Sequence, residues 1–152
     1  MKKMSKQENL KPIEVLLVED NPGDIVLTKE IFRESKILVN LNVVTDGLEA
    51  LAYLNKEGEY NGKPQPNIIL LDLNLPKMNG FELLAEIKKN KSLKNIPVVV
   101  LTCSEATEDI VRIYALRANC FITKPVNLEQ FNKVIKGISD FWFNIVKLPP
   151  TS

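Results

Sequence analysis

Histidine is absent from this sequence of 152 residues. Its absence excludes Ser-His-Asp and Cys-His catalysis, histidine metal sites and phosphohistidine chemistry on this chain. There are two cysteines, Cys103 and Cys120, which are too few for a disulfide framework and suit a thiol-reducing compartment. Any proton or phosphoryl chemistry must therefore depend on carboxylates, lysine, hydroxyl groups or a hard metal ion.

Strong net charge and long apolar runs are also missing. Lys and Arg total 20 against 19 Asp and Glu, so the net charge of +1 gives no strong attraction to nucleic acid or anionic lipid. The apolar runs are too short to cross a bilayer, and the charged start over 1–11 lacks the apolar stretch of a secretory signal. We therefore expect a cytoplasmic protein. Hydrophobic residues, at 45%, suffice for the packed core of one domain.

Five short apolar runs alternate with segments of helical periodicity. The runs cover 14–18, 41–45, 67–71, 97–101 and 120–123. Helical spacing of apolar residues follows in about 22–35, 48–54, 81–87, 106–118 and 128–145. Strands that are apolar on both faces and alternate with helices favour a parallel sheet covered on both sides. In such α/β sheets, ligands bind beyond the carboxyl ends of the strands.

Local signals predict where individual segments begin and end. Asn21-Pro22 is typical of an N-cap followed by a first helical residue. Leu48, Leu51 and Leu54 are expected to lie on one face of the second helix. The segment 55–66 carries two Gly and two Pro, which is typical of a loop. Because it joins a helix to a strand, we expect it at the amino end of the sheet, away from the chemistry. It would serve packing or partner contact, or no specific role.

Polar side chains of related chemistry end four of the five predicted strands. Each alone is typical of a turn or a helix cap. Together, three carboxylates, one hydroxyl and one ammonium would meet at one edge of a parallel sheet. The residues are Glu19 and Asp20 after the first strand, Asp72 after the third, Thr102 after the fourth and Lys124 after the fifth. Thr45, at the end of the second strand, adds nothing comparable.

The chemistry of this set indicates phosphoryl transfer. Three adjacent carboxylates repel one another unless a cation lies between them, and Mg²⁺ takes carboxylate, phosphate and water oxygens as ligands. Asp72 could then attack phosphorus and form an aspartyl phosphate. Mg²⁺, Lys124 and the Thr102 hydroxyl would each neutralise one phosphoryl oxygen. The residues alone thus predict a Mg²⁺-dependent phosphoryl site.

The chain from about Pro12 to Ile145 resembles the receiver domain of two-component response regulators, in the superfamily of the chemotaxis response regulator. Thirty positions separate Asp72 from Thr102, and 22 separate Thr102 from Lys124, as in that family. The resemblance implies a flavodoxin-like (βα)5 fold, a doubly wound α/β parallel sheet of order 2-1-3-4-5. It places a receiver domain at 12–147 between polar tails at 1–11 and 148–152. The motifs that carry it are 18–21 (VEDN), 71–76 (LDLNLP) with 79–80 (NG), 101–102 (LT) and 123–125 (TKP).

The same resemblance implies roles for the metal-site residues. Asp72 would accept the phosphoryl group from a sensor histidine kinase. Asp20 and Asp72 would bind Mg²⁺ directly, joined by the backbone carbonyl of Asn74, with Glu19 acting through water. The protein would be no enzyme in the usual sense, because it would catalyse only its own phosphorylation and dephosphorylation.

The resemblance also implies a switch and identifies one departure. Thr102 would be the switch hydroxyl, and Phe121 the aromatic side chain that turns inward when Thr102 moves toward the phosphoryl group. An edge aromatic with no such role is the alternative for Phe121. Cys103 stands where the family has a smaller residue. We interpret it as a small buried hydrophobic residue, with slower phosphorylation or redox sensitivity as the alternatives.

Output is expected through contact with another protein, because no DNA-binding or cyclic-nucleotide module follows the last predicted helix. The stretch 141–146 is more apolar than one helix face can bury. Its large apolar residues would lie in a homodimer or partner interface, or in an extension folded back on the domain; they are Phe141, Trp142, Phe143 and Ile145. The NPGD turn at 21–24, the long loop and this tail resemble the stand-alone regulators of bacterial phytochromes, which implies a phytochrome as the kinase.

Two other functions remain open at this point. One is a Mg²⁺-dependent phosphohydrolase of the haloacid-dehalogenase type, which has a second aspartate two residues after its nucleophile. This chain has Asn74 there, and an amide cannot protonate a leaving group. The other is a pseudo-receiver scaffold that is never phosphorylated, against which the intact five-residue set argues.

Overall fold

Five parallel strands form one sheet at the centre of the molecule. The computed structural model describes residues 12–34, 38–103, 106–124, 127, 129–130 and 133. The strand order is β2-β1-β3-β4-β5, with every neighbouring pair parallel. The predicted fold class and strand order are therefore confirmed, and each strand boundary lies within two residues of its prediction. The strands are β1 (Ile13–Val18), β2 (Val39–Val44), β3 (Ile68–Asp72), β4 (Val98–Thr102) and β5 (Cys120–Thr123).

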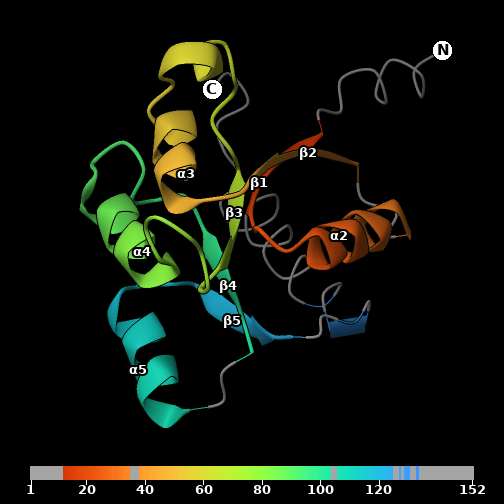
Figure 1. Ribbon diagram of the computed structural model, residues 1–152, viewed down its shortest axis with the longest axis vertical. Helices are drawn as coiled ribbons and strands as arrows, with labels where there is room; N and C mark the ends of the chain where they lie inside the picture. Colours follow the sequence, from red (N-terminus) through yellow and green to blue (C-terminus); the bar gives the residue numbers. More distant parts are fainter. Residues whose placement is uncertain are drawn as a thin grey trace, which may run out of the picture.

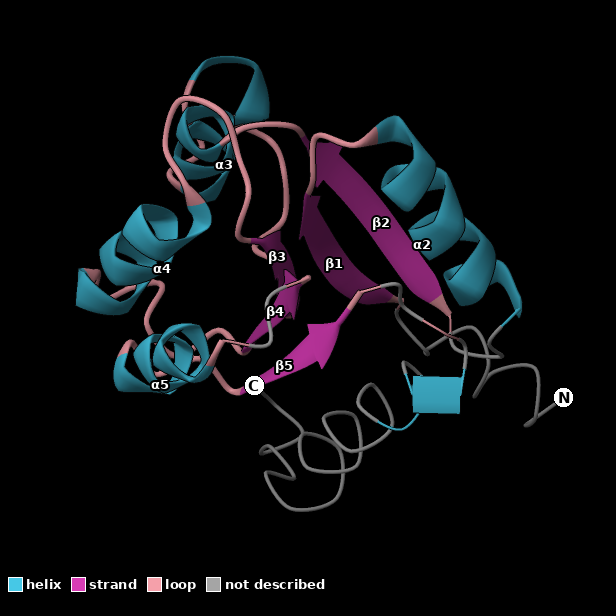
Figure 2. Ribbon diagram, turned by 60° about the horizontal axis from the view of Figure 1, so that its bottom comes forward, coloured by secondary structure: helices cyan, strands magenta, loops and turns pink. Residues whose placement is uncertain are grey.

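Helices cover both faces of the sheet. Helix α2 (Pro22–Glu34) lies on one face, and α3 (Gly47–Leu54), α4 (Gly80–Lys89) and α5 (Thr107–Ala115) lie on the other (Figures 1 and 2). The predicted helix at 128–145 lies almost wholly outside the described residues. So do the predicted tails at 1–11 and 148–152 and the four candidate interface residues, Phe141, Trp142, Phe143 and Ile145.

Two apolar cores, one on each face, hold these layers together. Successive residues of a strand point to opposite faces, so alternate strand residues enter different cores. Leu16 and Leu71 pack in the core that α3, α4 and α5 cover, whereas Leu17 and Leu70 pack in the core that α2 covers. Strands β3 and β4 are buried along their whole length, as expected for the centre of a doubly covered parallel sheet.

The predicted cap of α2 is confirmed, and the leucine face predicted for α3 is buried only in part. Asn21 Oδ1 accepts a hydrogen bond of 2.9 Å from the backbone N–H of Asp24, which satisfies a free donor of the first turn. In α3 the buried residues are Gly47, Ala50, Tyr53 and Leu54, while Leu48 is 52% exposed. Gly47 sets this face, because its Cα packs so closely on the Met78 backbone that Leu48 is turned outward.

The predicted loop at 55–66 packs against α3 and is hydrogen-bonded to it. It contains a short 3₁₀ helix, η1 (Gly58–Tyr60), and the Tyr60 hydroxyl donates a 2.6 Å hydrogen bond to Glu49 Oε2. The rings of Tyr53 and Tyr60 lie 5.2 Å apart. At its end the segment reaches the amino edge of the sheet, where the Asn67 N–H donates to the Glu14 carbonyl at 2.7 Å. The described contacts of this loop therefore serve packing.

Removing the Tyr60 hydroxyl should lower the stability of the protein by an amount that depends on pH. The hydrogen bond from Tyr60, followed by that from the Thr45 N–H, lowers the pKa of Glu49 below its ordinary value of 4.5. A lowered folded-state pKa stabilises the protein above the unfolded value, and this stabilisation is lost as the pH falls through the folded value. We expect Tyr60→Phe to cost about 1 kcal/mol of unfolding free energy at pH 7 and less below pH 4.5, measured by urea denaturation.

The matched control is Tyr114→Phe, on the half-exposed tyrosine of α5. It should change the unfolding free energy by less than about 0.5 kcal/mol at either pH. An equal loss of stability in Tyr60→Phe at both pH values would contradict the ionic character of the Tyr60–Glu49 bond.

Candidate functional site

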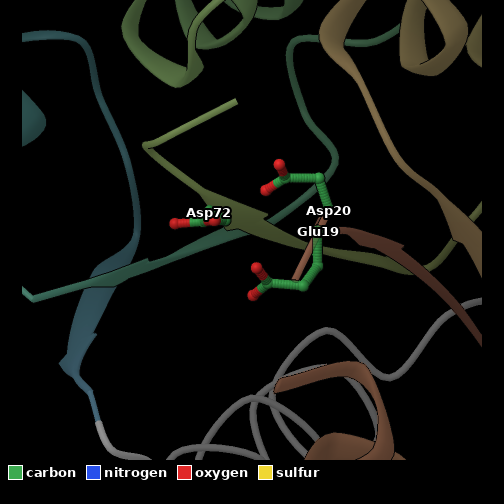
Figure 3. A group of neighbouring side chains, drawn as sticks. All are labelled: Glu19, Asp20 and Asp72. Carbon is green, nitrogen blue, oxygen red and sulfur yellow. The ribbon is translucent and has the colours of Figure 1, made fainter. Parts of the chain in front are cut away.

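The carboxyl ends of β1 and β3 bring three carboxylates together. The strands are in register with Val18 opposite Leu71, so the residues that follow, Glu19 and Asp72, are neighbours. Glu19, Asp20 and Asp72 each offer a carboxylate oxygen, and these oxygens lie within 4.8 Å of one another. In Figure 3, the Glu19 and Asp20 side chains leave the end of β1 in different directions, with Asp72 beside them on β3. Glu19 and Asp72 are buried, whereas Asp20 is exposed to solvent.

Lys124 reaches this cluster from the end of β5. Its backbone N–H donates a 2.8 Å hydrogen bond to the Thr102 carbonyl. The pairing of β5 with β4 therefore continues one residue beyond the end of β5. Its ammonium group donates 2.9 Å hydrogen bonds to Glu19 Oε1 and to Asp24 Oδ2, and lies 3.4 Å from Asp72 Oδ1. Only 10% of the Lys124 side chain is exposed. The predicted convergence of Glu19, Asp72 and Lys124 is thus present in the structure.

Burial and charge shift the pKa values of both buried partners. Burial, followed by the nearby Asp72, raises the pKa of Glu19 to about 7, although Lys124 opposes this rise. Burial alone would lower the pKa of Lys124, but its hydrogen bonds to Glu19 and Asp24 and the charge of Asp72 outweigh burial and raise it. The ammonium of Lys124 thus contacts three carboxylates, those of Glu19, Asp24 and Asp72, so acidic groups outnumber basic ones at this site.

This donor set fits a hard divalent cation. Carboxylate oxygens are the ligands that Mg²⁺ and Mn²⁺ prefer, and the exposure of Asp20 leaves an open side for water or phosphate oxygens. A cation would also favour the charged form of Glu19, whose pKa is raised by burial and, after it, by Asp72. Glu19, Asp20 and Asp72 are the residues that could hold it.

The loop between β3 and α4 is shaped to pass close beside Asp72. The Asn74 N–H donates a 3.2 Å hydrogen bond to Asp72 Oδ1, and the Gly80 N–H donates one of 3.0 Å to the Leu73 carbonyl. Asn79 caps α4 in a capping box with Glu82. A Cβ atom at Gly80 would lie 2.5 Å from Leu73 Cα and 2.7 Å from the Asp72 carbonyl oxygen. The Asn79-Gly80 pair of the sequence therefore lets α4 start against the backbone of Asp72.

Gly80→Ala should force α4 away from Asp72, because the clashing atoms are backbone atoms that cannot move aside singly. We expect a loss of about 1–3 kcal/mol in unfolding free energy, measured by urea denaturation. Gly62→Ala is the control, since a Cβ there meets nothing within 4 Å. If both variants were as stable as the original protein, the close packing of α4 on the Asp72 backbone would be refuted.

Three further predicted residues lie on or just after β4 and β5, and one interpretation is wrong. Thr102 is the last residue of β4 and is buried. Phe121, on β5, is partly buried, and its ring meets that of Tyr114 edge-on at 5.9 Å. Cys103 is exposed, so its interpretation as a small buried hydrophobic residue is wrong. It lies one residue past β4, where the chain has left the buried part of the sheet.

The sequence interpretation missed Asp24 as a member of the site. Asp24 lies in the first turn of α2, and its carboxylate binds the ammonium of Lys124 at 2.9 Å. Helical side chains point toward the helix amino terminus. Because α2 begins just after β1, an acidic residue in its first turn points back to the strand ends. An aspartate four residues after Asp20 was the available signal.

Comparisons with known proteins identify the family. A sequence profile of the response regulator receiver domain matches residues 15–136. The chain belongs to this family. It is 49% identical over 146 residues to the response regulator Rcp1 of Synechocystis sp., a match that covers 96% of this chain and 99% of Rcp1. The predicted family is therefore confirmed.

Solved structures agree with this assignment. The crystal structure of the phosphorylated cyanobacterial phytochrome response regulator RcpA superposes with a TM-score of 0.77 at 48% identity, covering 91% of this chain and 99% of RcpA. The Mn²⁺-bound form of Rcp1 has a TM-score of 0.76 at 49% identity, with the same coverage. The predicted similarity to phytochrome response regulators is confirmed.

The protein is therefore a response regulator of two-component signalling. Phosphorylation of an aspartate with Mg²⁺ is the general property of receiver domains, and the acidic cluster supplies divalent-metal ligands. Within the part of the chain that the structure describes, no helix has the length and apolar character needed to cross a membrane.

Proposed function

We propose that Asp72 is the phosphoryl acceptor and that Mg²⁺ is the metal of the site. The observation that supports this most is the meeting of Glu19, Asp20, Asp72 and Lys124 at one edge of the sheet. Asp72 is the member of this group that both touches Lys124 and lies at the centre of the sheet edge, on β3. Asp20, Asp72 and the backbone carbonyl of Asn74 would hold Mg²⁺ directly, and Glu19 would act through water.

The reaction is transfer of a phosphoryl group from a phosphohistidine of a sensor kinase. A carboxylate oxygen of Asp72 forms the new O–P bond, the N–P bond breaks, and its electron pair stays on the imidazole nitrogen of the kinase. Bound Mg²⁺ supplies positive charge to a phosphoryl oxygen. Lys124 donates a hydrogen bond to a second oxygen, and the Thr102 hydroxyl donates to a third. The buried position of Asp72 limits access of water to the new acyl phosphate.

The phosphorylated state is read out by movement and contact. Thr102 moves toward the phosphoryl group, and Phe121 turns inward from its partly buried position against Tyr114. The protein catalyses only its own phosphorylation and dephosphorylation. It then acts on a downstream protein in the cytoplasm, without binding nucleic acid or a membrane.

The similarity to Rcp1 and RcpA supports a phytochrome as the kinase. We test it with a co-encoded phytochrome histidine kinase that has been phosphorylated with radiolabelled ATP. The expected result is rapid transfer of label to this protein when Mg²⁺ is present. Label that stays on the kinase would contradict this pairing. Steady hydrolysis of phosphate esters would instead indicate a phosphohydrolase. If neither the kinase nor a small phosphodonor phosphorylated the protein, it would be a pseudo-receiver scaffold.

A homodimer is the expected assembly, with an interface that includes Phe141, Trp142, Phe143 and Ile145. The apolar character of this stretch supports the proposal. Sedimentation velocity should show a dimer that Trp142→Glu converts to a monomer. A monomer both with and without phosphorylation would contradict it.

A further inference from the structure

We propose that Asp24 is a positioning residue that holds Lys124 in the unphosphorylated protein and thereby slows phosphorylation of Asp72. The proposal rests on the proposed function of Asp72. It assigns to the first turn of α2 a direct influence on the reaction rate.

The two short hydrogen bonds of the Lys124 ammonium go to residues other than Asp72. Its ammonium donates 2.9 Å hydrogen bonds to Glu19 and to Asp24, while the distance to Asp72 Oδ1 is 3.4 Å. An ammonium has three N–H donors that point in different directions. Two of these donors are used by Glu19 and Asp24, and a shift of Lys124 from its 3.4 Å distance toward a phosphoryl group on Asp72 would lengthen one of the two short bonds.

Asp24 is the partner that Lys124 gives up most easily. The side chain of Glu19 is 0% exposed, so losing its bond to Lys124 would leave a carboxylate without solvent. The side chain of Asp24 is 37% exposed, so water can take the place of the ammonium there. The cost of breaking the Lys124 contact is therefore smaller at Asp24 than at Glu19.

The start of α2 keeps Asp24 in place when Lys124 leaves. The Asp24 N–H is bound by Asn21 Oδ1, and its carbonyl accepts a 2.9 Å hydrogen bond from the Thr28 hydroxyl. A carboxylate in the first turn of a helix is also stabilised by the free backbone N–H groups of that turn. These bonds fix the backbone of Asp24, so its carboxylate remains at the start of α2 when Lys124 moves away.

The consequence for the rate follows from the reaction with acetyl phosphate. An Asp72 oxygen forms a bond to phosphorus, the bond from phosphorus to the acetyl oxygen breaks, and acetate leaves with the electron pair. Asp24 opposes this step because it competes for Lys124 and repels the incoming phosphoryl charge. Since Asp24 is about one-third exposed, we expect Asp24→Asn to raise the phosphorylation rate about two- to fivefold.

The experiment measures the initial rate of phosphorylation by acetyl phosphate at saturating Mg²⁺ and fixed ionic strength. Asp24→Asn should be faster than the original protein, and Asp24→Glu, which restores the charge, should be close to it. Glu34→Gln at the other end of α2 makes the same charge change and should leave the rate unchanged. In a Lys124→Ala background, Asp24→Asn should lose most of its effect, because the two residues act through one contact.

An Asp24→Asn rate equal to or below that of the original protein would overturn the proposal. So would an equal acceleration in the Lys124→Ala background, because it would indicate a simple charge effect. If Asp24→Asn failed to fold, as judged by circular dichroism, Asp24→Ser would replace it, since serine also suits a helix start. If the original protein itself took up no phosphoryl group, the proposed function would fail instead, so the two failures are distinguishable.

Discussion

Asp72→Asn should take up no phosphoryl group from acetyl phosphate or phosphoramidate, whereas the original protein gains one per chain when Mg²⁺ is present. The amide of asparagine is a poor nucleophile and a weaker metal ligand than a carboxylate. The change is nearly isosteric at a buried position, so the fold should be retained. Intact mass spectrometry after incubation measures the result directly.

The matched control is Asp46→Asn, because asparagine can keep the N-cap hydrogen bond that Asp46 accepts from the Glu49 N–H. This variant should gain one phosphoryl group like the original protein. The same added mass on Asp72→Asn would refute the assignment of Asp72 as the acceptor.

Lys124→Ala should retain the fold yet lose both fast phosphorylation and the switch. Losing one donor to a developing phosphoryl charge costs about 100-fold in rate in comparable sites. The variant also loses the ion pair between Asp72 and Lys124, which connects the acceptor to the end of β5. We expect phosphorylation slowed by at least about tenfold, and no change in the NMR signals of Phe121 once the variant is phosphorylated.

The same variant should be less stable without a divalent cation. Glu19 would be left buried without its ammonium partner, which costs about 3 kcal/mol in comparable buried pairs. Mg²⁺ should restore part of this loss, because its charge replaces that of the ammonium. Lys63→Ala, on an exposed loop lysine, should match the original protein in rate and stability. A phosphorylated Lys124→Ala that shows the full set of Phe121 shifts would contradict the role of Lys124 in switching.

The fold and most of the site could be predicted because their signals are local. Each strand is a short apolar run, and four of the five carboxyl ends are marked by a residue such as Asp72 or Lys124. Parallel pairing then places these ends at one edge, whatever the details of packing. For this reason Glu19, Asp20, Asp72 and Lys124 could be placed together from their order in the chain alone.

The rest depends on contacts between segments that no local pattern reveals. Asp24 meets Lys124 across 100 positions, and only the direction of α2 brings the two together. The outward turn of Leu48 follows from close packing of Gly47 on Met78, which belongs to another loop. The exposure of Cys103 depends on where neighbouring elements stop covering β4. Each of these outcomes is set by tertiary packing rather than by periodicity or turn chemistry.

The most direct test of the account is a crystal structure grown with magnesium and beryllofluoride. We predict a Mg²⁺ ion bound by Asp20, Asp72 and the Asn74 carbonyl, with beryllofluoride on an Asp72 oxygen. Lys124 should have left Asp24 to contact a fluorine atom, and the Thr102 hydroxyl should contact another. Density for the ion or the fluoride elsewhere, or a Lys124 that points away from Asp72, would contradict the account.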